Sequence, residues 1–391
     1  MRVILPFTPK LSTYNLGPEH PLKPERFMLA VSLMRAYGLL AEENPSAAIP
    51  NKATVVEPDE VMREDLELVH DPGYIDVVMQ ASTDPDYFQS ARGIGPGDTP
   101  AATGLHEASL IVCGATARAV REVVAGHTDR AFAVAGGLHH AHHDRAAGFC
   151  VYNDPAVAIR MALRDNPELR VMYVDIDAHH GDGVEEAFER DANVLTLSVH
   201  ESGMYLYPGT GRVGDIGKGA GKGTAINVPL PPYADDACYA SVAEQVITPA
   251  ARAFNPDLIV AQCGADAHRD DPLTHLGLTL TGYRDLIRSL IGTAEECTQG
   301  RIVCTGGGGY GTYSVVPRAW TLVMAELLDT ELDRSLPEVW RKEVNRLTGG
   351  PIVDSLLDEE PWDSPIADDE LLAETQIVLE RVYGASPLLG G

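Results

Sequence analysis

Short apolar segments rich in β-branched residues alternate with longer segments of helical periodicity along most of this chain. Near-continuous apolar strands separated by helices are typical of a parallel sheet that is covered on both faces. The expected strands are 2–6, 130–135, 170–177, 194–200, 257–264 and 301–305, and the expected helices are 25–42, 104–125, 155–163, 235–254, 282–297 and 313–329. The pattern therefore predicts an α/β fold with one open, mainly parallel β-sheet flanked by helices on both faces.

No internal repeat or low-complexity linker interrupts this pattern, so residues 1–353 are expected to form a single domain. The polar, Gly- and Pro-rich stretch 83–101 is expected to be a long surface loop. Residues 354–391 are an acidic C-terminal extension, with ten acidic and no basic residues between Asp354 and Glu380. We expect this extension to pack on the domain or trail from it, with a helix near 369–381.

The formal net charge of −27 limits the classes of partner. A strongly acidic surface repels the phosphate backbone, so direct binding of nucleic acid is disfavoured. The same surface suits cationic partners such as Lys-rich protein segments or polyamines. A role in solubility explains the charge equally well at this point.

Nothing in the sequence predicts a membrane-bound or secreted protein. There is no apolar run of about 18 residues, and the N-terminus lacks the features of a signal peptide. The six cysteines show no Cys-x-x-Cys spacing, which is typical of free thiols in a reducing cytoplasm. We therefore expect a cytoplasmic protein and leave its oligomeric state open.

Four of the predicted strands end in polar or glycine-rich motifs. Ligands in an open parallel sheet bind at the carboxyl ends of the strands, so these motifs are expected to form one site. The motifs lie at 136–140, 175–182, 264–266 and 306–310.

The second motif contains candidate metal ligands. Asp175, Asp177 and His179 are spaced two residues apart, and alternate side chains of a strand point the same way. Asp177 and His179, with Asp266 from another strand end, offer two carboxylates and an imidazole, a donor set for which zinc is the usual ion. Three protein ligands leave a position for water, which indicates a catalytic site. Taken alone, the Asp-x-Asp-x-His spacing is also compatible with a capped strand end.

The adjacent His139 and His140 supply acid and base capacity near neutral pH. Asp175 and Asp182 are in excess of the metal ligands and can each hold one imidazole. Because two further histidines follow at once, a solvated His-rich loop is the competing interpretation.

Tyr310 follows the glycine run 306–309 and offers a phenol that can donate to a developing oxyanion. A plain turn is the alternative interpretation of the glycine run.

Together these motifs resemble the histone deacetylase superfamily, and within it the bacterial acetoin-utilization-type proteins (histone deacetylase-like amidohydrolases). The resemblance extends over about 20–320 and implies an arginase/deacetylase-like fold. The residues that carry it are HPLKPER (20–26), VHDPGYI (69–75), GLHHAHHDRAAGFCVYND (137–154), YVDIDAHHGDGV (173–184), TLSVH (196–200), YPGTG (207–211), QCGAD (262–266) and GGGGY (306–310).

The resemblance implies zinc-dependent hydrolysis of N-acetyl-lysine in proteins. The three metal ligands named above would hold Zn²⁺, with Fe²⁺ as an alternative ion. His140, paired with Asp182, would act as the general base, whereas His139, paired with Asp175, would remain electrostatic. Tyr310 would polarise the acetyl carbonyl.

Further positions are also implied by the resemblance. The substrate-binding residues would be Asp98, Gly148, Phe149, Tyr207 and Leu273. Arg26 and Leu138 would line an internal acetate channel. Asp175, Asp177 and Ser198 would hold a structural potassium ion. The partner would be an acetylated protein, with an acyl-CoA synthetase as the candidate suggested by the acetoin-utilization branch.

Several departures from the family pattern keep alternatives open. Leu138 replaces a common Trp, and Gly97 replaces a common aromatic beside Asp98. An acetylpolyamine deacetylase is the first alternative, although Leu273 stands where polyamine-specific members carry Glu. A binuclear manganese enzyme of the arginase type would need carboxylates where Gly181 and His268 stand. A metal-binding protein without catalysis is the third alternative.

Overall fold

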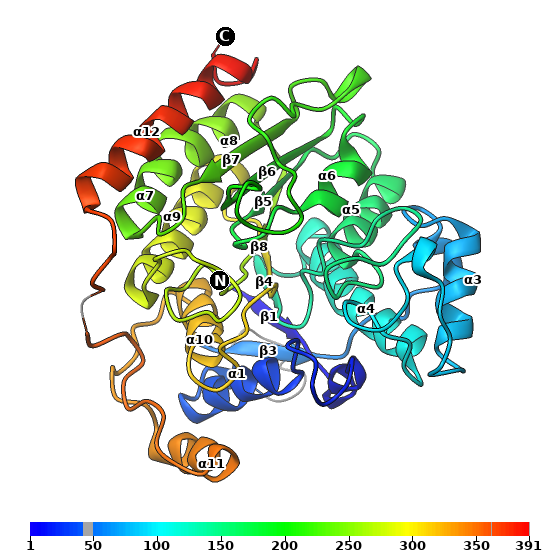
Figure 1. Ribbon diagram of the computed structural model, residues 1–391, viewed down its shortest axis with the longest axis horizontal. Coiled ribbons are helices and arrows are strands. Elements are labelled where there is room, and N and C mark those ends of the chain that lie inside the picture. Colours follow the sequence, from blue (N-terminus) through cyan, green and yellow to red (C-terminus); the bar gives the residue numbers. More distant parts are fainter. Residues whose placement is uncertain (42–49, 361, 391) are drawn as a thin grey trace.

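The computed structural model describes residues 1–41, 50–360 and 362–390. These residues form one nine-stranded sheet, in which all neighbouring strands run parallel (Figure 1). The strand order is β2-β3-β1-β4-β9-β8-β5-β6-β7. The strands are β1 (Val3–Pro6), β2 (Leu40–Ala41), β3 (Ala53–Val56), β4 (Arg130–Ala133), β5 (Val171–Asp175), β6 (Val194–Glu201), β7 (Ala225–Leu230), β8 (Leu258–Gln262) and β9 (Ile302–Thr305).

Helices cover both faces of the sheet. One layer contains α3, α4, α5 and α6, and the other contains α1, α7, α8, α9, α10 and α12 (Figure 1). The helices are α1 (Glu25–Ala36), α2 (Arg63–Leu66), α3 (Pro72–Ala81), α4 (Leu105–Val124), α5 (Asp154–Asp165), α6 (Asp182–Phe188), α7 (Asp236–Val242), α8 (Thr248–Phe254), α9 (Leu280–Thr298), α10 (Val316–Leu327), α11 (Glu338–Thr348) and α12 (Asp368–Ala385). The predicted single-domain α/β fold with a parallel sheet is thereby confirmed.

Every residue of the central strands β4, β5, β8 and β9 is buried. Helices on both faces exclude water from both sides of these strands, which explains their unbroken apolar sequences. The register places Asp175, the last residue of β5, opposite Gln262 of β8 and Ser198 of β6. The polar residues of three neighbouring strands therefore lie next to one another near the carboxyl ends of these strands.

All six predicted strands are present, with shifts of a few residues at their ends. The sequence prediction missed β2, β3 and β7. The predicted helix 25–42 was too long, because the chain turns at Gly38 (φ 74°) and enters β2. Its last residue, Glu42, lies outside the described residues. The predicted helix 235–254 consists of α7 and α8, joined by a π-helical turn at Ala243–Ile247.

The acidic C-terminal residues contain α12, close to the predicted helix 369–381. The buried side chains Leu371, Leu379 and Val382 lie on α12, which packs against β7 and α7. All six cysteines are free, as expected. Among the described helices none is long and apolar enough to cross a membrane.

Candidate metal centre and active site

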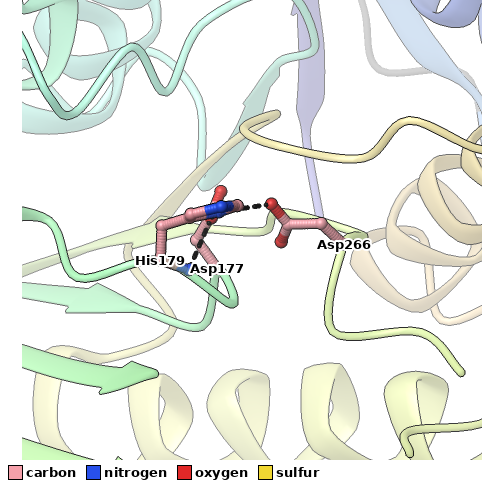
Figure 2. Close-up of side chains that lie close together, drawn as sticks. All are labelled: Asp177, His179 and Asp266. Atoms are coloured by element: carbon pink, nitrogen blue, oxygen red, sulfur yellow. Dashed lines mark hydrogen bonds and ion pairs between the residues drawn. The ribbon is translucent and has the colours of Figure 1, made fainter. Parts of the chain in front are cut away.

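The carboxyl ends of β5 and β8 bring Asp177, His179 and Asp266 together (Figure 2). The His179 Nδ1 atom lies 3.1 Å from Asp177 Oδ1 and 3.0 Å from Asp266 Oδ2. Both carboxylates are fully buried, and His179 is 8% exposed. The three predicted metal ligands therefore lie together, although Asp177 and Asp266 are 89 residues apart in the sequence.

Each carboxylate has one oxygen held away from His179 and one beside the imidazole, and the latter oxygen of Asp177 also accepts from the His179 amide at 3.0 Å. Asp177 Oδ2 accepts hydrogen bonds from Gln262 Nε2 and from the Gly308 amide, both at 2.6 Å. Asp266 Oδ1 accepts one from the Ala178 amide at 2.8 Å. The remaining donors, two oxygens and one nitrogen, match the ligand set of a divalent cation such as zinc.

The charge of the cluster also fits a cation. Burial and the neighbouring charge of Asp177 raise the pKa of Asp266 to about 6. Two carboxylates in a water-excluded site disfavour each other's ionised form, and a bound cation offsets that repulsion. The residues present therefore fit the metal ion that the sequence predicted.

Two histidine–carboxylate pairs lie next to this cluster. His139 Nδ1 lies 2.8 Å from Asp175 Oδ2, and His140 Nδ1 lies 2.7 Å from Asp182 Oδ1. The pairing expected from the resemblance is the pairing found in the structure. With both Nδ1 atoms held by carboxylates, the two Nε2 atoms face each other at 3.0 Å.

The two imidazoles have different proton affinities. Burial alone would lower the pKa of His139, but Asp175 and Asp177 outweigh burial and raise that pKa to about 9. Burial and the charge of His139 lower the pKa of His140 to about 4. At neutral pH, His140 is thus the neutral ring that can accept a proton, as a general base must.

The competing interpretation, a solvated His-rich loop, does not fit His139, His140 or His142, which are buried. His142 is 8% exposed, and its Nε2 lies 3.3 Å from Asp182 Oδ2 while its Nδ1 contacts Glu186. His143 is exposed, with its Nδ1 2.6 Å from the Val69 carbonyl oxygen. Asp182 therefore serves two imidazoles, which the sequence analysis did not foresee.

The glycine run passes close to the metal cluster. A Cβ atom on Gly308 would overlap Asp266 Oδ2, so only glycine fits there. Arg26 lies buried beneath the run and donates from Nη1 to the carbonyl oxygens of Gly307 (2.7 Å) and Gly309 (3.1 Å). The run is therefore a tightly held part of the site rather than a plain turn.

Tyr310 follows this run, and its ring centre lies 6.5 Å from that of His179. Burial, with Asp266 and Asp177 nearby, raises the pKa of Tyr310 well above its ordinary value, so the phenol keeps its proton. The Tyr310 amide donates to Asp271 Oδ2 at 2.7 Å. Asp271 was not among the residues predicted from the sequence.

Aromatic side chains border the approach to the cluster. The Tyr207 ring lies 5.1 Å from His140 and is 47% exposed, and the Phe149 ring lies 5.9 Å from Tyr310. The Gly148 amide donates to Asp98 Oδ2 at 2.9 Å. These contacts join four of the five predicted substrate-binding residues to His140, to Tyr310 or to one another.

The fifth, Leu273, is 38% exposed and is linked to the site through Asp271 Oδ1, which accepts from the Leu273 amide at 3.0 Å.

The other predicted positions lie deeper. Arg26 stacks over the Trp320 ring at 5.2 Å, and the buried Leu138 amide donates to Asp154 Oδ1 at 2.8 Å. Ser198, expected beside a potassium ion, has its Oγ 2.8 Å from His200 Nδ1. Its register opposite Asp175 places the two residues on adjoining strands.

A cavity of about 570 Å³ lies beside Tyr207 and Asp182. Its charged lining is mainly acidic, with Asp182, Glu185, Glu186, Glu189 and Asp215 against Arg145, Lys218 and His142, whose pKa burial lowers but Asp182 and Glu186 raise to about 9. The lining of this cavity therefore favours positively charged ligands.

Comparisons with known proteins agree on one family. The histone deacetylase domain family matches residues 20–327. The acetoin utilization protein AcuC of Bacillus subtilis is 37% identical over 336 residues, which cover 85% of this chain and 84% of that protein. AcuC of Staphylococcus aureus strain MSSA476 is 33% identical over 337 residues, with the same coverage.

Solved structures give the same result. The crystal structure of a histone deacetylase homologue from Aquifex aeolicus superposes with a TM-score of 0.83 at 30% identity, over 98% of this chain and 100% of that chain. A structure of a histone deacetylase homologue in complex with SAHA superposes equally well.

Proposed function

Because this chain belongs to the histone deacetylase family, in its bacterial acetoin-utilization branch, we propose that it is a zinc-dependent hydrolase of N-acetyl-lysine in proteins. The observation that carries the proposal is that His140 and Tyr310 both lie next to the Asp177–His179–Asp266 cluster, with ring centres 5.8 Å and 6.5 Å from that of His179. A base and an oxyanion donor beside a metal centre are the groups that amide hydrolysis requires.

Lewis-acid activation of a water molecule and of the acetyl carbonyl is the chemistry that a zinc ion supplies when bound. His140 accepts the proton of the attacking water, and Asp182 holds its Nδ1 proton and stabilises the resulting imidazolium. The Tyr310 hydroxyl donates to the carbonyl oxygen as negative charge develops there. His140 then returns the proton to the leaving amine, so that the C–N bond breaks and acetic acid and the amine result, which are acetate and an ammonium group at neutral pH.

The remaining assignments are part of the same proposal. Phe149 and Tyr207 enclose the lysine stem, and Asp98 binds the substrate backbone. Arg26 and Leu138 belong to the acetate exit. A structural potassium ion is held by Asp175, Asp177 and Ser198. Fe²⁺ in place of zinc would use the same ligands, and an acyl-CoA synthetase is the proposed class of acetylated protein in the cytoplasm.

An acetylpolyamine is the second candidate substrate, because the acidic cavity beside Tyr207 also suits a small cation. Leu273 at the rim offers such a cation no carboxylate. The arginase-type alternative lacks support, because His268 is engaged with Asp358 instead of facing a second metal.

Turnover of the zinc-loaded protein on an acetyl-lysine peptide and on acetylputrescine, measured side by side, tests the proposal. We expect the peptide to be preferred, and Tyr310→Phe to lower kcat by about a hundredfold or more because an oxyanion donor is lost. Tyr383→Phe is the matched control, since it removes a hydroxyl that bonds only the Gln245 carbonyl oxygen on the surface. A preference for acetylputrescine would shift the substrate assignment to acetylpolyamines. Zinc binding without turnover on either substrate would contradict the assignment of this protein as a deacetylase.

A further inference from the structure

Asp358 is a buried carboxylate in the acidic C-terminal segment, beyond the residues that match the family. Its side chain is 7% exposed. The Oδ2 atom accepts from the Leu280 amide at 2.8 Å and lies 3.0 Å from His268 Nε2, and Oδ1 lies 3.3 Å from Arg318 Nη1. A buried charge must be offset in this way, so Asp358 is fixed strongly to both side chains.

His268 and Arg318 belong to the segments that follow Asp266 and Tyr310 along the chain. His268 lies two residues after the metal ligand Asp266. The Asp270 amide donates to His268 Nδ1 at 3.1 Å, so in the neutral ring Nε2 carries the hydrogen and donates to Asp358. Arg318 lies in α10, the helix that directly follows the Tyr310 loop, and its Nε donates to the Ser314 carbonyl oxygen at 2.5 Å.

Asp271 joins the two segments, in addition to a backbone hydrogen bond from the Ala265 amide to the Gly308 carbonyl oxygen at 2.9 Å. Asp271 accepts from the Tyr310 amide at 2.7 Å through Oδ2 and from the Leu273 amide at 3.0 Å through Oδ1. The Asp271 amide in turn donates to the His268 carbonyl oxygen at 2.9 Å. The position of the Tyr310 backbone therefore depends on a turn whose first residue is held by Asp358.

The C-terminal segment is itself fastened to the domain. The Leu356 amide donates to the Arg334 carbonyl oxygen at 2.7 Å, and Arg269 Nη2 donates to the Glu360 carbonyl oxygen at 2.9 Å. In Figure 1 the segment runs as an extended orange-to-red coil between α11 and α12. The backbone on both sides of Asp358 is thus bonded to the domain, so the Asp358 side chain can hold other residues in place.

We propose that Asp358 is a positioning residue: by binding His268 and Arg318 it holds the 268–273 turn and the Tyr310 loop in the arrangement that catalysis uses. This inference rests on the proposed function and assigns to the acidic C-terminal segment a part in the active site. A displacement of about 1 Å at a catalytic group is enough to lower a rate strongly.

The test compares Asp358→Asn and Asp358→Ala with Asp354→Asn in zinc-loaded, full-length protein on the acetyl-lysine peptide. Asp354 lies in the same segment, but its side chain is 75% exposed and pairs with Arg341. We expect kcat to fall about tenfold to a hundredfold in the Asp358 variants at unchanged zinc content, and to be unchanged in Asp354→Asn. In a Tyr310→Phe background the same Asp358 substitutions should lower kcat little further, because both changes remove the same interaction between the Tyr310 hydroxyl and the substrate.

Hydrogen–deuterium exchange provides a readout that does not depend on turnover. Amides in 267–275 and 307–313 should exchange faster in Asp358→Asn than in the wild type or in Asp354→Asn, with α4 and α5 unchanged. A loss of kcat that is proportional to lost zinc, that is fully additive with Tyr310→Phe, or that leaves the two segments equally protected would overturn the inference. A wild-type protein without turnover would refute the proposed function, whereas the exchange result would still decide whether Asp358 holds these segments.

Discussion

His139 and His140 lie side by side with their Nε2 atoms 3.0 Å apart, and each ring is held from behind by a different carboxylate. Burial and the positive charge of the adjacent His139 lower the pKa of His140, which disfavours its protonation. This arrangement therefore gives two neighbouring histidines different proton affinities. Four predictions concern these histidines and the residues around them.

Asp182→Asn should lower kcat/KM by about a hundredfold or more, because the amide cannot stabilise the imidazolium that forms on His140. Zinc content should stay unchanged, since Asp182 is not a proposed ligand. Steady-state kinetics and metal analysis check both statements, with the exposed Asp165→Asn as control. Wild-type kinetics in Asp182→Asn would contradict the assignment of His140 as base.

His142 should make stability depend on pH. Burial lowers the pKa of His142, but Asp182 and Glu186 outweigh it and raise that pKa to about 9. Since the folded-state pKa exceeds the ordinary value, the stabilisation is fully present below about pH 6.5 and is lost as the pH rises through about 9. His142→Gln should therefore destabilise the zinc-bound protein by about 2 kcal/mol near pH 6 and by less near pH 9.5, as measured by urea unfolding.

The control for His142 is His127→Gln, which replaces a side chain that is 65% exposed. It should leave the difference in unfolding free energy between the two pH values unchanged. Equal destabilisation of His142→Gln at both pH values would show that its charge is not the stabilising factor.

Zinc should raise the melting temperature of the metal-free protein, because an ion that binds only the folded state stabilises it, by about 2.7 kcal/mol at a hundredfold excess over Kd. Asp266→Asn should abolish this rise, since it removes one charged ligand. Asp285→Asn, whose side chain is 55% exposed on α9, should retain it. Thermal scans with and without zinc, combined with metal analysis, measure the effect. A zinc response that survives in Asp266→Asn would place the ion elsewhere.

Gly308→Ala should lose both zinc and activity, because its new methyl group would overlap Asp266 Oδ2 and displace a ligand. Gly292→Ala on α9 is the matched control, since its methyl group would have no atom of a neighbouring element within 4 Å. This control should be neutral or slightly stabilising, as expected for glycine to alanine in an exposed helix. Full zinc binding by Gly308→Ala would show that the loop can move aside.

The fold was predictable because strands buried on both faces carry a signal in their own sequence. The six strands found from the sequence are apolar along nearly their whole length. By contrast, β2 has only two residues, and β7 contains Pro229, which argues against a strand in general but is tolerated at the edge where β7 lies.

The candidate site was predictable to the extent that its residues lie in short motifs. The two histidine–carboxylate pairs and the metal cluster have the partners expected for them. Asp271 and Asp358 were missed because neither lies in one of the short motifs, although their separations of 39 residues from Tyr310 and 90 residues from His268 are similar to those within the pairs and the cluster that were predicted. A single acidic residue in an acidic stretch carries no signal of such pairing, and only the folded chain shows it.

The packing of α12 against β7 has a consequence for self-association. Because β7 is the last strand of the sheet, its outer backbone groups have no further strand to bond among the described residues. Such a margin is a template onto which a strand of another chain can add, and nearby covering structure hinders that addition. Because α12 packs on β7, we expect it to hinder such addition between copies of the protein.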